Sequence, residues 1–204
     1  MSAIQELRLG PELNGMLMTP VEFDAVQDYD DEYTYELVHG VLVVNPIPLE
    51  AEVGPNELLG YLLLSYQYGH PQGSALNLTL PERYVRTRDS RRRADRVIWA
   101  GLGRLPNWKR EPPTIAAEFV SAGKRNRLRD YEEKRHDYMR IGIKEYWIID
   151  RFERTMTVIR NRPNRPRRLV IREGEIYTTP LLPGFELPLA RLLALADALE
   201  QPDE

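Results

Sequence analysis

The segment from Thr114 to Asp150 constrains the fold more than any other part of the sequence. Its first run, Thr114 to Ser121, is apolar at both odd and even positions, which is typical of a strand buried on both faces. A helix is predicted from about Leu128 to Ile141, ending at Gly142, and Lys144 to Asp150 reads as a second dense strand. Two strands joined by a helix at this spacing favour a right-handed crossover unit.

Hairpins and further helices are expected around this unit. His39-Gly40 is typical of a tight turn between two short strands, and Gly174 is expected to mark a hairpin between the last two strands. The predicted helices are 21–28, 50–68 and 189–199, and the other predicted strands are 35–38, 41–44, 75–80, 93–100, 155–160, 167–172 and 175–178, with an arginine-rich loop between 75–80 and 93–100. We therefore expect an α/β fold, with a mixed sheet flanked by helices and antiparallel hairpins in its N- and C-terminal parts.

The composition excludes several classes of site. The chain has 204 residues and no cysteine, which excludes disulfides and thiolate zinc sites, and its three histidines argue against a multi-histidine zinc site. A net charge of −3 argues against binding nucleic acid by charge alone. We find no apolar stretch of about 20 residues and no secretory pattern, so we expect a cytoplasmic protein without a membrane partner.

Glu118 is the most informative residue for function. It is a lone carboxylate in the apolar run, and burying such a group costs several kcal/mol unless a cation, a metal or hydrogen bonds compensate. The functional interpretation is a metal or catalytic site. The alternative is a structural ion pair with a buried arginine or lysine.

Asp95 is the second candidate acid. It opens a strand whose same-face neighbours, Val97 and Trp99, are apolar. An aspartate at this position is often only a turn or edge residue. Neighbouring strands would, however, bring Asp95 and Glu118 within reach of one hard cation such as Mg²⁺.

Lys134 is the candidate cation of the site. Stepping at 100° per residue places it on the helical stripe of Leu128, Tyr131, Tyr138 and Ile141. Lysine also packs its stem on apolar surfaces while keeping a hydrated head, which is the structural alternative. The functional interpretation directs the ammonium at the carboxylates. A direct Lys134–Glu118 contact without room for a metal would instead indicate a buried ion pair.

Two arginine clusters stand out from the acidic background. They comprise Arg83, Arg86, Arg88, Arg91, Arg92, Arg93 and Arg96, and then Arg160, Arg162, Arg165, Arg167, Arg168 and Arg172. Such clusters usually form solvated faces, and the alternative is contact with a phosphate backbone. We name Arg91, Arg92, Arg93 and Lys124 as candidate backbone contacts.

In this order the motifs resemble a known family. The quoted residues are Tyr35-Glu36-Leu37-Val38-His39-Gly40, Asp95 before an apolar strand, Glu118-Phe119-Val120-Ser121, Lys134, Glu145-Tyr146-Trp147-Ile148-Ile149-Asp150, and Pro180-Leu181-Leu182-Pro183-Gly184. The chain resembles the Uma-two-type restriction endonuclease family, small bacterial proteins within the PD-(D/E)XK nuclease superfamily. The likeness runs from about residue 17 to residue 190.

The resemblance implies a restriction-endonuclease-like core and Mg²⁺-dependent cleavage of nucleic acid, with DNA expected as the substrate and Mn²⁺ as an alternative metal. It implies metal binding by Asp95, Glu118 and the carbonyl of Phe119, with Lys134 and Glu36 as further catalytic residues. The implied organisation is an N-terminal extension at 1–16, a nuclease domain at 17–190 and a C-terminal helix and tail at 191–204. We also expect a homodimer, which nucleases that cut both strands of a duplex often form.

The sequence departs from the family pattern at three places. Ala94 stands where the family usually has proline, and Val120 stands where the motif lysine is expected; Lys134 resembles its relocated substitute. Ser121-Ala122-Gly123 replaces the usual Ser-Pro-Ser type of loop. The alternative function is therefore a catalytically inactive nuclease fold that serves as a DNA-binding or interaction module.

Overall fold

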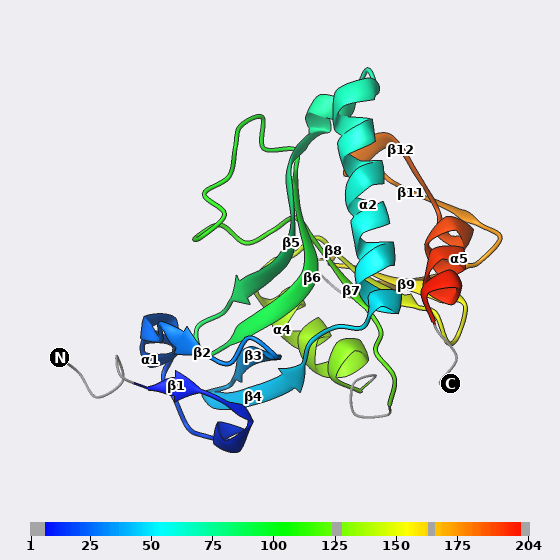
Figure 1. Ribbon diagram of the computed structural model, residues 1–204. Coiled ribbons are helices and arrows are strands. Elements are labelled where there is room, and N and C mark those ends of the chain that lie inside the picture. The colour runs from blue at the N-terminus through cyan, green and yellow to red at the C-terminus, as the bar shows by residue number, and fades with distance from the viewer. Residues whose placement is uncertain (1–6, 124–127, 163–165, 201–204) are drawn as a thin grey trace. The chain divides into compact units, whose positions relative to one another are not determined.

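The computed structural model describes residues 7–123, 128–162 and 166–200. It divides into two compact units, one formed by residues 1–48 and 84–93, and the other by residues 49–83 and 94–204. We call these unit 1 and unit 2. The ribbon in Figure 1 carries the element labels used below. No helix in the described part of the chain is both long and apolar enough to cross a membrane.

Unit 1 is built on the predicted hairpin. Strand β3 (Tyr33–Val38) pairs antiparallel with β4 (Val41–Pro46), with Val38 opposite Val41. The turn residues His39 and Gly40 have φ angles of 48° and 81°, as expected of a tight hairpin turn with both central residues in the left-handed region. Glycine adopts this conformation without strain, which explains its place in the motif.

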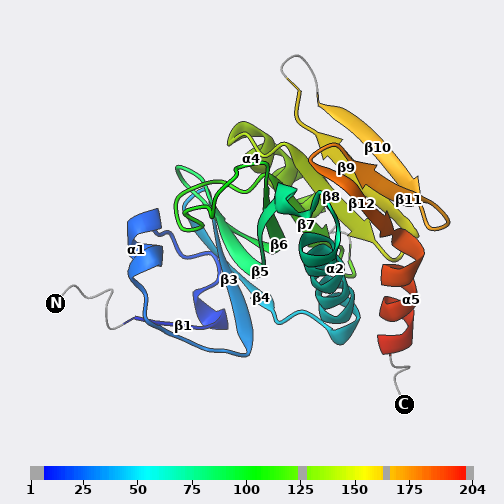
Figure 2. The ribbon, with the colours of Figure 1, turned by 90° about the horizontal axis from the view of Figure 1, so that it is seen from above.

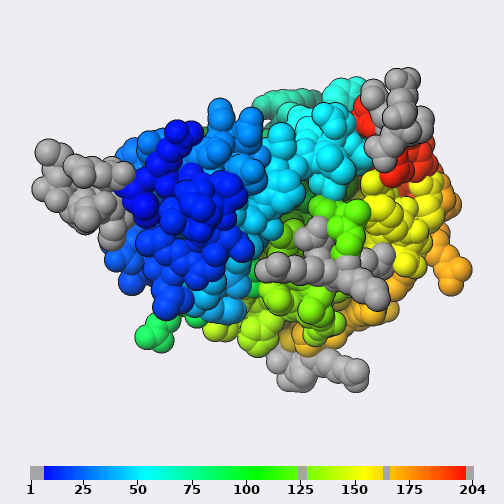
Figure 3. Space-filling view, turned by 60° about the horizontal axis from the view of Figure 1, so that its bottom comes forward, coloured from blue at the N-terminus to red at the C-terminus, as the bar shows by residue number. Residues whose placement is uncertain are grey.

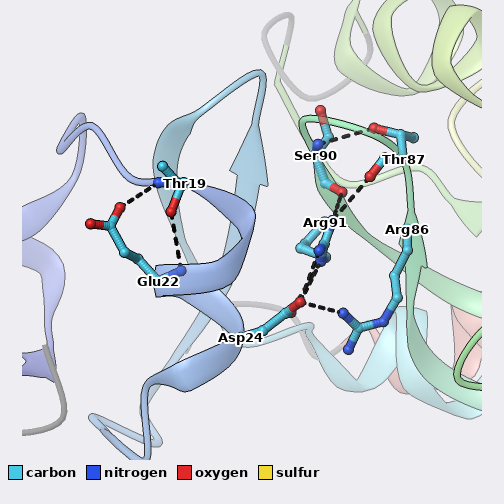
Figure 4. Close-up of polar contacts among 7 residues, drawn as sticks. All are labelled: Thr19, Glu22, Asp24, Arg86, Thr87, Ser90 and Arg91. Atoms are coloured by element: carbon cyan, nitrogen blue, oxygen red, sulfur yellow. Dashed lines mark hydrogen bonds and ion pairs between the residues drawn. The ribbon is translucent and has the colours of Figure 1, made fainter. Parts of the chain in front are cut away.

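The N-terminal segment joins the core of unit 1. Strand β1 (Arg8–Leu9) pairs parallel with β2 (Asp28–Tyr29), and Leu9 is buried with Met18 and Phe23. Part of the expected 1–16 extension is therefore packed structure. Helix α1 (Pro20–Ala25) is shorter than predicted and begins with a capping box, shown in Figure 4, in which Thr19 and Glu22 exchange hydrogen bonds.

The predicted arginine-rich loop is wrong. Strand β5 (Leu76–Arg86) and strand β6 (Arg91–Ala100) extend toward each other, so only 87–90 remains between them. Arg86 and Arg91 both bind the carboxylate of Asp24 (Figure 4), with closest N–O distances of 2.6 and 2.8 Å. Both guanidinium groups therefore donate to one carboxylate and tie β5 and β6 to α1.

Unit 2 contains the sheet that positions the candidate site. The strand order is β10-β9-β8-β7-β6, and β5 pairs with β6. The bounds are β7 (Ile115–Phe119), β8 (Glu145–Asp150), β9 (Thr155–Arg160) and β10 (Arg167–Arg172). Strands β7 and β8 are parallel, as the strand–helix–strand pattern predicts, whereas β6–β7, β8–β9 and β9–β10 are antiparallel. The mixed α/β architecture confirms the predicted fold class.

Helices cover both faces of this sheet. Helix α2 (Glu50–Gly69) and helix α4 (Lys134–Arg140) lie on opposite sides of the strands in Figure 2. Because side chains alternate along a strand, one face of β7 sends Ala117 and Phe119 into the apolar core shared with α2. The other face sends Glu118 toward α4. This alternation separates the core from the polar cluster.

The predicted hairpin between 167–172 and 175–178 is wrong. Strand β10 pairs with β9, while β11 (Ile176–Thr179) pairs with β12 (Leu182–Pro188), a strand that the sequence analysis missed. Pro183 and Gly184 interrupt the β12 pattern, which concealed it. The last helix, α5 (Leu189–Leu199), agrees with the prediction and packs along α2 (red beside cyan in Figure 3).

Glu145 ties the C-terminal hairpin to the sheet. Its buried carboxylate accepts hydrogen bonds from Arg160 Nε at 2.8 Å, Trp147 Nε1 at 3.0 Å, Tyr177 Oη at 2.8 Å and Thr179 Oγ1 at 3.0 Å. These donors satisfy a buried carboxylate that is otherwise costly, so the first residue of the Glu-Tyr-Trp motif has a structural role.

Replacing Glu145 by alanine is expected to destabilise the fold by about 3 kcal/mol, because four donors lose their acceptor in a buried site. Urea unfolding followed by tryptophan fluorescence measures the change. Glu186, an exposed acid on β12, is the matched control, and its alanine variant is expected to stay within about 0.5 kcal/mol of the wild type. Equal stabilities of the two variants would contradict the proposed tie.

Candidate active site

The register of β6 and β7 brings the two predicted acids together. Arg96 pairs with Ala117 in this antiparallel ladder, and continuing the register places Asp95 opposite Glu118. Both side chains face α4, since the alternate residues Ile98 and Ala117 belong to the core on the α2 side. Asp95 Oδ2 accepts a hydrogen bond from the backbone N–H of Phe119 at 2.6 Å. The aspartate is thereby fixed to the end of the strand that carries the glutamate.

Glu118 is 2% exposed and is held by two side chains of α4. Its Oε2 accepts a hydrogen bond from Lys134 Nζ at 2.7 Å, and its Oε1 accepts one from Tyr138 Oη at 2.8 Å. Lys134 is itself only 3% exposed. The structure thus places Asp95, Glu118 and Lys134 in one cluster. The direct contact between Lys134 and Glu118 also agrees with the alternative interpretation, in which these two residues form a structural ion pair.

Asp130 is a member of this cluster that the sequence analysis missed. Its Oδ1 lies 3.6 Å from Lys134 Nζ, and the residue is 2% exposed. The helix begins with a π-helical turn, Arg129–Glu133, whose carbonyl at Asp130 accepts a hydrogen bond from Tyr146 Oη at 2.9 Å. Because a π turn adds a residue, the regular 100° stepping fails before Lys134. Leu128, predicted on the buried stripe, is therefore exposed.

A useful signal for Asp130 was its spacing of four residues before Lys134, which puts a carboxylate and an ammonium on one helical face. Acidic and basic residues at this spacing are common on exposed helices, so the spacing alone does not indicate a site. Only the burial of both side chains separates this pair from a surface pair.

Burial and mutual repulsion make the cluster electrostatically unfavourable. Burial raises the pKa of Asp95 to about 7; the charges of Glu82 and Asp130 raise it too, while Lys134 and the Phe119 N–H lower it. Burial also raises the pKa of Glu118 well above its usual value, with Asp95 and Asp130 acting in the same direction against Lys134. The charge on Lys134 does not offset the cost of ionising these acids, which is typical of functional sites.

Replacing Asp95 by asparagine is expected to change how stability depends on pH. The folded protein binds a proton at Asp95 up to about pH 7 and the unfolded chain releases it near pH 3.8, so this group's stabilisation is lost as pH rises between these values. Between pH 4 and pH 7.5, the free energy of unfolding of the variant should therefore rise by about 2 kcal/mol relative to that of the wild type. This is roughly half of the free energy that corresponds to the full pKa shift, because Asp95 is partly exposed. Urea unfolding at several pH values measures this difference. A constant difference would contradict the raised pKa.

The other predicted site residues are placed as follows. Glu36 lies on β3 in unit 1, where its Oε1 accepts a hydrogen bond from the Arg93 N–H at 2.7 Å. The catalytic role of Glu36 stays a prediction, as does metal binding by the Phe119 carbonyl. Arg91 and Arg92 are buried, which argues against the predicted contacts of these two residues with a phosphate backbone. Lys124 lies outside the described residues.

The donor chemistry of the cluster fits a hard divalent cation. Asp95, Glu118 and Asp130 are buried or partly buried carboxylates, the oxygen donors that Mg²⁺ prefers, and a cation would relieve their repulsion. Among the described residues, however, no three acidic, histidine or cysteine side chains form a ready metal-binding set. The ammonium of Lys134 is the cation that now contacts Glu118.

Comparisons with known proteins agree with this fold and motif order. A family model described as "Uma2: Putative restriction endonuclease" matches residues 20–190. Among solved structures, a crystal structure of a "putative nuclease belonging to DUF820" from Anabaena variabilis ATCC 29413 is similar, with a TM-score of 0.68 and 15% sequence identity. The match covers 88% of this chain and 99% of that chain, and at this identity it establishes the fold alone. No curated protein matches the chain.

The family match covers most of the chain and includes the segments that carry Asp95, Glu118 and Lys134. The similar structure shows that this chain shares its fold with a protein described as a putative nuclease. This chain therefore belongs to the Uma2 family, whose members are described as putative restriction endonucleases.

Proposed function

We propose that this protein is a Mg²⁺-dependent endonuclease that hydrolyses phosphodiester bonds, with DNA as its substrate. The observation that carries the proposal is the buried cluster of Asp95, Glu118 and Lys134, two acids and a lysine joined by strand register and helix packing. Its unfavourable electrostatics support a functional role, since a purely structural network would be expected to satisfy its charges as Glu145 does.

In this proposal the acids hold the cation, and Mn²⁺ can replace Mg²⁺. Asp95 and Glu118 are the principal ligands, with the Phe119 carbonyl as a further contributor. When bound, the cation supplies a Lewis acid for the scissile phosphate and lowers the pKa of a bound water. The Phe119 N–H fixes the carboxylate of Asp95, and Tyr138 fixes that of Glu118.

Lys134 supplies positive charge at the reacting centre. Its ammonium either orients the attacking water or neutralises the charge that develops on the phosphate. The helix also excludes water around it, because Lys134 and Tyr138 are both buried. A low-polarity setting strengthens the interaction between this ammonium and a phosphate oxygen.

Exposed arginines on β10 support contact with a nucleic-acid backbone. Arg167, Arg168 and Arg172 are solvent-exposed, and Arg162 is exposed just after β9. In contrast, Arg160 binds Glu145 and Arg96 is buried against Asn56, so these two cannot serve this purpose. The exposed arginines would position the backbone without reading sequence.

The rival proposal is an inactive module that binds DNA or a partner through this fold. One observation favours it: Lys134 contacts Glu118 directly at 2.7 Å, which is the geometry of a structural ion pair. The absence of the motif lysine at Val120 points the same way.

Cleavage of labelled DNA and RNA separates the two. Single- and double-stranded substrates are incubated with the wild type and with Asp95→Ala, purified in the same way, in Mg²⁺, Mn²⁺ or EDTA. We expect cutting of DNA that requires Mg²⁺ or Mn²⁺ and is lost in Asp95→Ala. Binding of the substrates without cutting in any metal would favour the inactive module, and cutting retained in Asp95→Ala would overturn the site assignment.

A further inference from the structure

Lys134 lies between two buried carboxylates, and this arrangement has a consequence for metal binding. Its Nζ is 2.7 Å from Glu118 Oε2 and 3.6 Å from Asp130 Oδ1. We propose that Lys134 is the internal counter-ion of the metal-free site, and that it transfers from Glu118 to Asp130 when a divalent cation binds Glu118. Asp130 is then a positioning residue for Lys134. This inference rests on the proposed metal-dependent function.

The first step of the argument is competition for one carboxylate. Glu118 has two oxygens, one engaged by Lys134 and the other by Tyr138. A divalent cation that binds Glu118 must therefore share it with an ammonium in contact, and two cations at one buried carboxylate repel each other. Cation binding is easier if the ammonium has a second anion nearby.

Asp130 provides that second anion. It lies one turn before Lys134 on the same helix, so no backbone movement is needed to bring the two together. Shortening the Nζ–Oδ1 distance from 3.6 Å to a normal ion-pair distance of about 2.8 Å requires only a rotamer adjustment of the flexible lysine stem. Arg129 Nε lies 3.5 Å from the same Oδ1, so Asp130 already has a positive charge beside it.

A π-helical turn anchored to the sheet carries Asp130. Asp130 lies within the π-helical turn Arg129–Glu133, four residues before Lys134, and shares a helix face with it. The hydrogen bond from Tyr146 Oη to the Asp130 carbonyl holds the turn in place. Tyr146 comes from β8, so the sheet itself fixes the position of Asp130, the second ion-pair partner of Lys134.

Calcium binding by variants tests the transfer without relying on cleavage. Ca²⁺ titrations by calorimetry are compared for the wild type, Asp130→Asn, Lys134→Met and the double variant. We expect Lys134→Met to bind Ca²⁺ about tenfold more tightly, because the competing ammonium is gone. Asp130→Asn should bind Ca²⁺ about tenfold more weakly, because Lys134 no longer has the negative charge of Asp130 to move to.

The double variant gives the decisive comparison. If Asp130 acts through Lys134, Asp130→Asn weakens Ca²⁺ binding by only about threefold once Lys134 is methionine, the remaining effect of its charge. An equal weakening in both backgrounds, or unchanged affinity in Lys134→Met, would overturn the inference. Lys134→Gln, which keeps a donor for Glu118, replaces Lys134→Met if that variant does not fold. Glu132→Gln, an exposed acid of the same turn, should leave Ca²⁺ affinity unchanged.

The failure of this inference differs from the failure of the proposed function. If no variant binds Ca²⁺, Mg²⁺ or Mn²⁺, the metal-dependent function and the transfer of Lys134 are both wrong. If the wild type binds Ca²⁺ but the effects at residues 130 and 134 simply add, only the transfer is wrong.

Discussion

Replacing Glu118 by glutamine is expected to reduce metal-dependent cleavage by a factor of about 10³, while the protein stays as stable as the wild type or becomes more stable near neutral pH. The loss follows because the amide cannot supply the negative charge that holds the cation. The gain follows because burial and the charges of Asp95 and Asp130 make ionised Glu118 costly in the folded state.

This pair of opposite effects distinguishes a functional acid from a structural one. If Lys134 and Glu118 instead formed a favourable structural ion pair, the same substitution would lower the free energy of unfolding, because the stabilising contact would be lost. Cleavage rates and urea unfolding of the same preparation measure both effects. Glu132→Gln, on the exposed side of the π turn, is the control and should change neither. A destabilised Glu118→Gln variant that still cleaves at the wild-type rate would contradict the proposal.

Replacing Lys134 by methionine is expected to destabilise the protein by about 3 kcal/mol near neutral pH. Methionine fills a similar volume, so the cost arises mainly from Glu118, which loses the closest cation at 2.7 Å while remaining buried. The carboxyl can take up a proton, and this limits the loss.

The double variant Glu118→Gln/Lys134→Met tests this reason directly. It removes both charges, so most of the lost stability should return. Urea unfolding of the wild type, both single variants and the double variant gives the coupling between the two residues. Additive losses would show that Lys134 stabilises the fold through its packing alone, and would contradict the electrostatic account.

Several features of the fold follow from local pattern. The parallel pair β7–β8 joined by a helix was predictable because apolar runs on both faces of two strands require a covered sheet. The turn at His39-Gly40 was predictable because its left-handed backbone selects residues such as glycine. The pairing of β11 with β12 was not, because Pro183 and Gly184 disguise β12 and strand partners are chosen by tertiary packing.

For the candidate site, the sequence by itself determined that Glu118 needs a compensating group, because an acid in a doubly apolar strand is costly. It also indicated Lys134 as a candidate cation and Asp95 as a second acid of the site. Only the tertiary structure decided that Asp130 joins them, because the spacing of four residues is common on exposed helices and the burial of Asp130 and Lys134 comes from the packing of their helix. It also decided that Arg91 and Arg92 are buried while Glu145 is a structural tie, since side chains far apart in the sequence supply their surroundings. Local pattern fixes which residues need partners, and the assembled sheet and helices fix which partners they meet.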